Sequence, residues 1–231
     1  MKISGLQKLT LLDYPGKTAA LIFTPGCNFR CPFCHNAVLV LDAESVESIS
    51  EDEVLSYLKK RKGILEGLSV TGGEPLMQKG IKEFLLQVKE TGYSVKLDTN
   101  GTYPDKLEEL IACGAVDYVA MDIKNRPEKY AETAGVERLD LSRISRSKEL
   151  LLSGSVDYEF RTTVVRELMT PDDVEAAAKW ITGAKRYCLQ KFKDSGGLIK
   201  DGLGAYSDDD MKAMAERVKK HVKEVILRGI D

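Results

Sequence analysis

The sequence lacks the features that would place a protein in a membrane, outside the cell or on a nucleic acid. Its longest uninterrupted apolar runs, residues 19–23 and 37–41, are far shorter than the roughly 20 residues that cross a bilayer. Charged and polar residues interrupt the first ten positions, so no signal peptide is predicted. Thirty-four Lys and Arg against 36 Asp and Glu give a net charge of -2, which favours neither nucleic acid nor an anionic membrane as a partner. We therefore expect a cytoplasmic protein.

Cysteine is scarce, and its five copies are an odd number. Three of them fall within eight residues, which indicates a metal or catalytic cluster in a reducing compartment rather than a disulfide framework. Proline is also scarce, with seven copies, and the hydrophobic fraction of 43% is ordinary for a globular chain. Collagen-like, low-complexity and disordered chains are thereby excluded. The length predicts a single domain over residues 1–231.

Short apolar runs alternate with longer amphipathic stretches along the chain. The runs predict six strands, near residues 18–24, 67–71, 94–99, 117–123, 157–165 and 186–192. Apolar residues at helical spacing predict helices around residues 81–88 and 107–111, and Leu150 to Leu152 are predicted to close another helix before Gly154. A glycine-rich segment over residues 193–205 is predicted to be a loop beyond the last strand.

Three further helices have recognisable first turns, at Ser50, Thr170 and Ser207. The last of them carries an apolar stripe from Met211 to Val225, which is predicted to pack on the sheet. Regular alternation of strands and helices predicts an α/β fold with a parallel sheet and right-handed crossovers. Periodicity alone leaves an open doubly wound sheet and a complete or partial barrel as alternatives.

The strongest chemical signal is a CxxxCxxC motif formed by Cys27, Cys31 and Cys34, directly after the first predicted strand. Soft thiolates select zinc, copper(I) or iron–sulfur clusters. A structural zinc site draws a second ligand pair from elsewhere, and the isolated Cys113 and Cys188 do not form one. Three cysteines on a cluster that ordinarily takes four leave one metal position open, which is typical of a catalytic centre.

Polar residues follow the next three predicted strands. The second strand leads into a Thr-Gly-Gly-Glu-Pro turn, in which two glycines permit close backbone approach and Glu74 can accept hydrogen bonds from an ammonium group. The third and fourth strands end at Asp98-Thr99-Asn100 and Asp122-Ile123-Lys124. Strand ends on this side of an α/β fold collect active-site residues. The alternatives are that residues 98–100 cap the next helix and that Asp122 pairs with Lys124.

The fifth predicted strand has one polar face, because Arg161 and Thr163 alternate with Phe160 and Thr162. If that face lines a barrel, Arg161 meets a cofactor or a substrate backbone, and Gln190 on the sixth strand does likewise. A surface salt bridge of Arg161 is the alternative.

These motifs resemble the radical S-adenosylmethionine enzymes, whose hallmark is CxxxCxxC with an aromatic residue, here Phe33, before the third cysteine. The LDTNG and MDIK strand ends resemble the branch of the family that activates glycyl-radical enzymes. A turn at Asp13-Tyr14-Pro15-Gly16 resembles the D-x-P-G turn of those activators. Together with residues 24–36, it makes the whole chain similar to the activating proteins of anaerobic ribonucleoside-triphosphate reductase.

The resemblance implies a partial (β/α)6 barrel that carries one [4Fe–4S] cluster on the three motif cysteines. It implies that S-adenosylmethionine, with a monovalent cation beside it, is held by Phe33, Gly72, Gly73, Glu74, Asp98, Thr99, Asn100, Asp122, Lys124 and Gln190. In this reading the Gly-Gly-Glu element holds the methionine amino group. Lys124 meets the methionine carboxylate, and Asp13 and Arg161 meet the substrate. No acid–base residue is required.

The implied reaction is a one-electron cleavage of S-adenosylmethionine to methionine and a 5′-deoxyadenosyl radical. That radical would generate a glycyl radical on a partner, anaerobic ribonucleotide reductase, with a flavodoxin- or ferredoxin-type protein as electron donor. Two other readings stay open: a radical enzyme that acts on a small molecule or peptide, and a zinc-binding interaction module.

Overall fold

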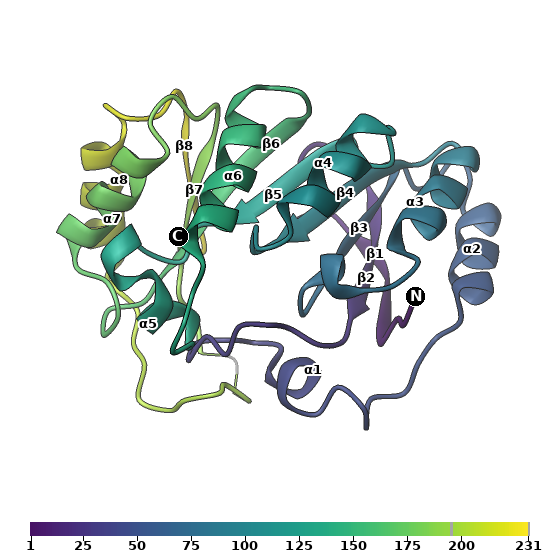
Figure 1. The fold of residues 1–231 in the computed structure, drawn as a ribbon, viewed down its shortest axis with the longest axis horizontal. Helices are drawn as coiled ribbons and strands as arrows, with labels where there is room; N and C mark the ends of the chain where they lie inside the picture. The colour runs from purple at the N-terminus through teal and green to yellow at the C-terminus, as the bar shows by residue number, and fades with distance from the viewer. Residues whose placement is uncertain (195, 231) are drawn as a thin grey trace.

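The computed structural model describes residues 1–194 and 196–230, so Ser195, within the predicted loop 193–205, lies outside the described residues. Eight strands form one sheet in the order of the sequence (Figure 1). They are β1 (Gly5–Thr10), β2 (Ala19–Thr24), β3 (Gly67–Gly72), β4 (Ser94–Thr99), β5 (Tyr118–Asp122), β6 (Asp157–Val164), β7 (Tyr187–Lys191) and β8 (Val225–Arg228). The first pair, β1 and β2, is antiparallel, and every following pair is parallel.

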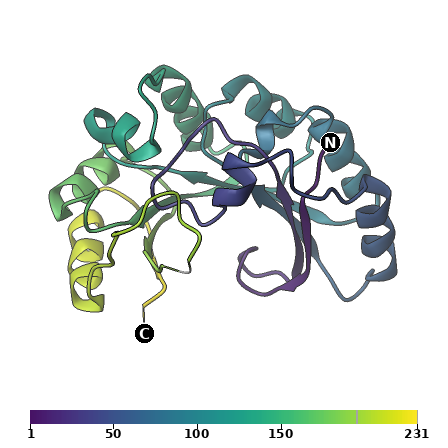
Figure 2. The ribbon, with the colours of Figure 1, turned by 90° about the horizontal axis from the view of Figure 1, so that it is seen from below.

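Helices connect the parallel strands. They are α1 (Ala37–Leu41), α2 (Glu51–Lys60), α3 (Ile81–Glu90), α4 (Pro104–Ala112), α5 (Tyr130–Ala134), α6 (Leu141–Leu152), α7 (Pro171–Trp180) and α8 (Asp208–Val218). All but α1, which lies beside the cysteine loop, cover the outer side of the sheet (Figure 1 and Figure 2). Figure 2 shows the sheet as an open arch with most of these helices around its outside. In the described part of the chain, β1 pairs only with β2 and β8 only with β7, so the arch does not close into a barrel. The predicted α/β fold with a partial barrel is confirmed.

The two faces of the strands differ in the way that their sequences predict. On β3 and β4, Leu68, Val70, Val95 and Leu97 are fully buried against the helices. The alternate residues of the same strands, such as Asp98, face the inside of the arch. The apolar face therefore forms the core with the helices, and the polar face is left to line the inside.

The six predicted strands are all present, each within about two residues of its predicted bounds. The predicted helix starts are also confirmed. Ser50 accepts a hydrogen bond from the backbone N–H of Glu53, and Thr170 and Ser207 form reciprocal capping boxes with the third residue of their helices. The described residues of the loop 193–205 contain no helix or strand, as predicted.

The prediction for the last helix was wrong at its end. The apolar stripe was expected to continue to Val225, but α8 ends at Val218 and Val225 begins strand β8. Val225 lies beside Tyr187 of β7 in a parallel pair, so hydrogen bonding to the sheet edge overrides the helical spacing. Strand β1 was not predicted either, and it pairs with β2 at the other edge of the sheet. The sheet thus has two strands more than the six expected.

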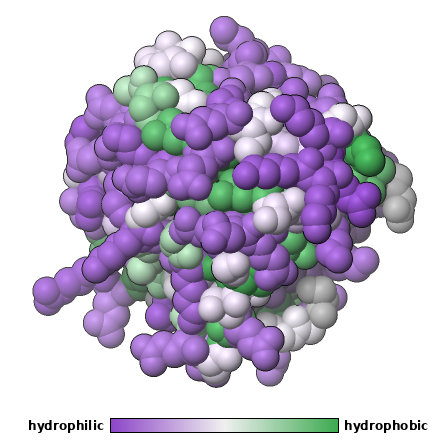
Figure 3. Space-filling model, turned by 90° about the vertical axis from the view of Figure 1, so that its right-hand side faces the viewer, coloured by the Kyte–Doolittle hydropathy of each residue, from purple (hydrophilic) through white to green (hydrophobic). Residues whose placement is uncertain are grey.

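The outer surface is mainly hydrophilic. Figure 3 shows the side that carries α2 and α3, on which hydrophobic side chains form small separate patches among hydrophilic ones. Among residues 1–194 and 196–230, no helix has the length and apolar character to cross a bilayer.

Candidate active site

The carboxyl ends of the parallel strands surround a cavity of about 250 Å³. It is lined by residues of the cysteine loop and α1, and by residues in the last part of β3, β4, β5, β6 and β7 or directly after these strands. They are Cys27, Phe29, Cys31, Phe33, Cys34, His35, Asn36, Val40, Thr71, Gly72, Gly73, Asp98, Thr99, Asn100, Asp122, Lys124, Arg161, Thr163 and Gln190. The structure therefore brings together all but two of the site residues predicted from the sequence. The exceptions are Glu74 and Asp13.

The loop that carries the three cysteines is held by backbone hydrogen bonds at its start and in its middle. At its start, the N–H of Gly26 donates to the carbonyl of Leu39 in α1, at 2.7 Å. In its middle, the N–H of Arg30 donates to the carbonyl of Ala134 in α5, at 2.9 Å. The next residue of that helix end, Gly135, adopts a φ of 66°, and a Cβ there would lie 2.0 Å from the carbonyl oxygen of Arg30. Close contact with α5 therefore fixes the loop.

The three cysteines fit an iron–sulfur cluster. All three line the cavity, and Cys31 is buried while Cys27 and Cys34 are partly buried. Burial raises the pKa of Cys27 to about 12 and also raises the pKa of Cys31, so a metal must displace protons from these thiols when it binds. The described residues contain no group of His, Cys, Asp and Glu side chains around a single metal ion. A four-iron cluster attaches each cysteine to a separate iron, so it does not need such convergence.

The glycine pair after β3 is required by contacts within the protein. A Cβ on Gly73 would lie 1.9 Å from the carbonyl oxygen of Gly26, and one on Gly72 would lie 2.4 Å from the backbone of Thr24. The N–H of Gly73 donates to Thr24 and the N–H of Glu74 donates to Gly26. Both glycines were predicted to permit close approach of the backbone to a ligand, and they also let the turn pack directly on the cysteine loop.

Glu74 lies behind the cavity wall rather than in it. Its side chain is fully buried and accepts hydrogen bonds from the N–H of Leu76 at 3.0 Å, the hydroxyl of Thr99 at 2.9 Å and the N–H of Asn100 at 2.7 Å. Burial raises the pKa of Glu74 to about 7, although the three hydrogen bonds act in the opposite direction and lower it. The direct ammonium contact expected for this carboxylate is therefore corrected to a supporting position, because its oxygens already join β3 to the end of β4.

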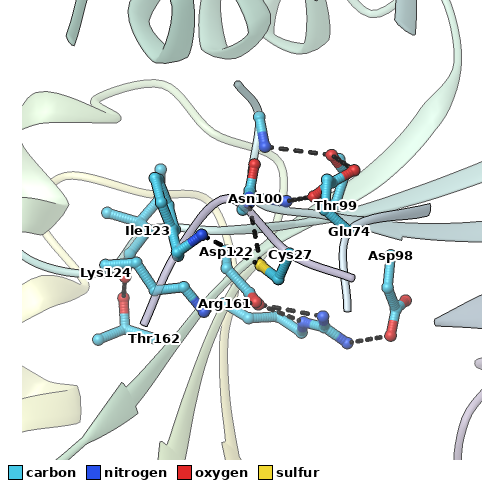
Figure 4. A network of polar contacts seen from close by, with 12 residues as sticks. Cys27, Glu74, Asp98, Thr99, Asn100, Asp122, Ile123, Lys124, Arg161 and Thr162 are labelled. Atoms are coloured by element: carbon cyan, nitrogen blue, oxygen red, sulfur yellow. Dashed lines mark hydrogen bonds and ion pairs between the residues drawn. The ribbon is translucent and has the colours of Figure 1, made fainter. Parts of the chain in front are cut away.

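A row of alternating charges crosses the cavity wall from β4 to β6 (Figure 4). Arg161 donates to Asp98 at 3.0 Å and to Asp122 at 3.0 Å, and these carboxylates also pair with Lys96 and Lys124, the latter at 2.9 Å. Burial opposes ionisation of Asp98, but the charges of Arg161 and Lys96 lower its pKa to about 2. Burial likewise opposes charge on Lys124 and Arg161, whose pKa values are nevertheless raised by the aspartates. Asp98, Asp122, Lys124 and Arg161 therefore stay charged near neutral pH.

The positions of these side chains decide between the alternatives left open for Arg161, for residues 98–100 and for Asp122. The side chain of Arg161 is only 13% exposed, so it is not a surface ion pair. Thr99 and Asn100 do not cap α4, because its N-cap residue is Tyr103, which makes no side-chain capping hydrogen bond. Asp122 does pair with Lys124, and both also line the cavity.

Several cavity residues were not predicted from the sequence. Asn36 donates from its side chain to the carbonyl of Gly72 at 2.9 Å, and Val40, Thr71 and Phe29 complete the wall. Their position directly beside the cysteine and glycine motifs was the available signal. His35, the residue after Cys34, has its Nε2 atom 2.6 Å from the carbonyl oxygen of Lys193, and its ring stacks on Phe192.

Asp13 lies away from the cavity lining. Its carbonyl accepts a hydrogen bond from Ser69 of β3 at 3.1 Å, and its carboxylate accepts one from Thr10 at 2.5 Å. The adjacent Tyr14 is buried with Tyr118, at the amino end of β5. The turn therefore lies against the inner face of the sheet, below the cavity. The backbone N–H of Lys17 closes the turn by donating to the carbonyl of Tyr14 at 3.1 Å.

Known proteins share this sequence and fold. The sequence profile of the radical SAM superfamily matches residues 21–181. A protein of Methanocaldococcus jannaschii with the provisional name glycyl-radical enzyme activating enzyme is 33% identical over 239 residues, covering 99% of this chain and 96% of that protein. The pyruvate formate-lyase-activating enzyme of Listeria monocytogenes is 27% identical over 163 residues, 64% of each chain.

A solved structure supports the architecture. Streptococcus suis SuiB bound to S-adenosylmethionine matches 90% of this chain with a TM-score of 0.70. The identity is 14% and this chain spans 52% of the SuiB chain, so the likeness shows the fold alone. The superfamily match implies an enzyme with a [4Fe–4S] cluster and S-adenosylmethionine as cofactors. The chain therefore belongs to the radical SAM superfamily, in the branch of the glycyl-radical activating enzymes.

Proposed function

We propose that this protein generates a glycyl radical on a partner enzyme, and that the partner is anaerobic ribonucleoside-triphosphate reductase. The observation that carries the proposal is one cavity in which three cysteines face a wall of alternating charges, inside an arch with unpaired edge strands. The similarity to a named activating enzyme over nearly the whole chain supports the same function. A flavodoxin- or ferredoxin-type protein would supply the electron.

The residues of the cavity divide the binding work between them. Cys27, Cys31 and Cys34 would hold the cluster, and Phe33 would shield it beside Lys124, whose ammonium lies 5.7 Å from the ring centre. The cofactors, when bound, supply a carbon-centred oxidant that can remove a hydrogen atom from a C–H bond. The protein must therefore keep the pocket shaped and fix the orientation of what enters it.

The charged wall suits a zwitterionic cofactor. Lys124 offers a cation to a carboxylate, and the backbone carbonyls of Gly72 and Gly73 can accept from an ammonium group. Asp98 and Thr99 offer oxygens to a ribose or a monovalent cation, and Gln190 offers an amide from β7. The strongly shifted pKa values of Asp98, Lys124 and Arg161 keep these groups charged, so they orient ligands and do not transfer protons.

The substrate is proposed to be a glycine loop of another protein. Removal of a hydrogen atom from the glycine Cα gives a radical that is delocalised over the flanking peptide groups, and a flexible loop can enter an open arch. Arg161 uses three of its nitrogens on aspartates and has further N–H groups for a substrate carbonyl. The Asp13 turn lies below the cavity, on the inner face of the arch, where it can contact the incoming backbone.

The test is anaerobic incubation of the reconstituted protein with reductant, S-adenosylmethionine and the reductase, followed by electron paramagnetic resonance. We expect a stable glycyl-radical signal on the reductase. With reductase that contains deuterated glycine, we expect deuterium to appear in 5′-deoxyadenosine. Transfer of deuterium only from a metabolite would instead favour a radical enzyme that acts on a small molecule. An air-stable, colourless preparation that contains zinc would favour the interaction module.

We further propose that the chain works as one radical SAM domain in the cytoplasm. The single sheet that includes elements from both ends of the chain supports the first part. Five cysteines that form no disulfide suit a reducing compartment, in which an iron–sulfur cluster persists. Limited proteolysis that released a stable fragment with its own core would contradict the single domain.

A further inference from the structure

The side chain of Asn100 points to the cluster end of the cavity. The resemblance assigned this residue to S-adenosylmethionine, but its amide nitrogen lies 3.8 Å from the sulfur of Cys27 and 2.9 Å from the side-chain oxygen of Asn28 (Figure 4). Asn100 is itself only 6% exposed. The amide therefore faces a cysteine that would carry one iron.

The orientation of this amide is fixed by a neighbour. The backbone N–H of Thr102 lies 3.0 Å from the side-chain oxygen of Asn100, and a backbone N–H can only donate. The hydroxyl of Thr102 donates to the same oxygen at 2.7 Å. Because the oxygen must face Thr102, the NH₂ group must face Cys27 and Asn28. The usual ambiguity between the two ends of an asparagine amide is thereby removed.

The backbone of Asn100 and its neighbour Asn28 are also held in place by hydrogen bonds. The backbone N–H of Asn100 donates to the buried carboxylate of Glu74 at 2.7 Å. Asn28, the next residue after Cys27, donates to the hydroxyl of Thr102 at 3.0 Å. The amide is thus held between the cysteine loop and the end of β4, with little freedom to turn away.

The three cluster cysteines differ in their hydrogen bonds. The sulfur of Cys27 has two N–H donors, the amide of Asn100 and the backbone N–H of Phe29 at 3.4 Å. Among the side chains of residues 1–194 and 196–230, only that of Asn100 donates to the sulfur of a cluster cysteine. Cys27 is therefore the cluster cysteine whose sulfur a side-chain donor from another strand end can reach.

Hydrogen bonds to cysteine sulfurs help to set the reduction potential of iron–sulfur clusters. A donor stabilises the sulfur more when the cluster gains an electron, so it raises the potential. We propose that Asn100 is a positioning residue of the cluster, whose amide donates to the Cys27 thiolate and makes the cluster easier to reduce. This inference rests on the assignment of Cys27 to the cluster, but it does not depend on the identity of the partner.

The test is a redox titration of the reconstituted cluster without any partner protein, read by electron paramagnetic resonance. Asn100→Ala removes the donor, and Asn100→Asp replaces it with an acceptor of similar shape. At a fixed poised potential we expect the ratio of reduced to oxidised cluster to fall about tenfold in Asn100→Ala, a shift of about 59 mV for one electron. The fall should be larger in Asn100→Asp. The ratio is read on the assembled fraction, so partial cluster loading does not affect it.

The matched control is Thr102→Val, which removes a hydroxyl from the same network but keeps the backbone N–H that orients the amide. We expect its potential to stay close to that of the wild type. Wild-type potentials in both Asn100 variants would overturn the proposal, and so would a shift in Thr102→Val as large as that in Asn100→Ala. Failure of both Asn100 variants to assemble any cluster would also contradict it, because a residue that only tunes the potential is dispensable for assembly. If the Asn100 variants show the expected shift in potential but the wild-type protein forms no glycyl signal on the reductase, only the proposed partner is contradicted.

Discussion

At the scale of single residues, the carboxyl group of Glu74 has an environment very different from water. It is fully buried between β3 and β4, and burial raises its pKa to about 7 from an ordinary value of 4.5. Between these two pH values the folded protein keeps a proton that the unfolded chain has released. The stability of the fold therefore falls as pH rises from about 4.5 to about 7, and this group adds no further change above that range.

The first prediction follows from this linkage. Glu74→Gln should lose the part of the pH dependence that Glu74 causes, which amounts to up to about 3 kcal/mol between about pH 4.5 and about pH 7. The variant should also be less stable at low pH, because its NH₂ group would face the N–H of Asn100. Urea unfolding at several pH values measures both effects. Glu83→Gln, at an exposed position of α3, is the control, and an equal pH slope in wild type and Glu74→Gln would contradict the prediction.

At the scale of elements, the cysteine loop depends on the end of α5. Gly135 and Gly154 both follow helices and both have positive φ, at 66° and 79°. Only Gly135 is crowded, since a Cβ there would lie 2.0 Å from the carbonyl oxygen of Arg30, whereas nothing lies within 4 Å of a Cβ on Gly154. The two positions share backbone strain and differ only in contact with the loop.

We therefore predict that Gly135→Ala lowers the iron and sulfide content of the reconstituted protein, while Gly154→Ala does not. In both variants the free energy of unfolding should fall by about 1 kcal/mol or more, because alanine is strained in the left-handed backbone conformation. The additional displacement of the cysteine loop in Gly135→Ala should appear as lost cluster and weaker S-adenosylmethionine binding. Iron analysis and equilibrium dialysis measure these quantities, and normal cluster content in Gly135→Ala would show that the loop adapts without cost.

Strand β8, at one edge of the sheet, is held by a buried ion pair. Arg228 donates twice to Glu159 of β6, at 2.9 and 2.8 Å, across the intervening β7. Glu159 is fully buried, and its other donor is the hydroxyl of Tyr118 at 3.1 Å. Removal of the arginine would leave the buried carboxylate of Glu159 without its ion-pair partner, and the hydroxyl of Tyr118 would remain as a donor.

The third prediction is that Arg228→Met destabilises the protein by about 3 kcal/mol or more. Arg217→Met, which breaks exposed ion pairs between α8 and α7, should cost about 1 kcal/mol or less. Urea unfolding compares the two variants. Equal losses would mean that the Arg228 pair adds no more to stability than a surface pair.

At the scale of the whole molecule, the cofactors connect parts of the chain that are distant in sequence. The cavity is lined by residues from Cys27 to Gln190, so a ligand that fills it contacts both halves of the arch. A ligand that binds only the folded state stabilises it in proportion to the logarithm of its concentration. At about 100 times its dissociation constant, S-adenosylmethionine should add about 2.7 kcal/mol.

We predict that this stabilisation requires the cluster. Cys27→Ala should lose iron and should show little change in unfolding temperature with S-adenosylmethionine, because the open iron position is missing. Cys113→Ala, which alters an exposed cysteine outside the cavity, should keep its iron and the full ligand effect. Thermal unfolding under anaerobic conditions checks the prediction, and loss of iron in Cys113→Ala would overturn the assignment of the cluster ligands.

The sequence by itself determined the local structure and most of the site. Apolar runs located the six central strands, and the Ser50, Thr170 and Ser207 signals located helix starts, because these features depend on neighbouring residues along the chain. The cysteine spacing identified one loop that carries three ligands. The polar strand ends at residues 98–100 and 122–124 were predicted to meet because parallel strands share one carboxyl edge.

Only the tertiary structure decided which contacts these residues make. Val225 is a strand residue because β7 offers it an edge, and its helical spacing could not show that. Glu74 is turned behind the wall by donors from β4, and Asn100 is turned to Cys27 by Thr102. Gly73 and Gly135 are needed because the cysteine loop lies on them from positions at least 46 residues away in the sequence. Local patterns set the elements, whereas burial, hydrogen-bond direction and close approach between distant segments are properties of the folded chain alone.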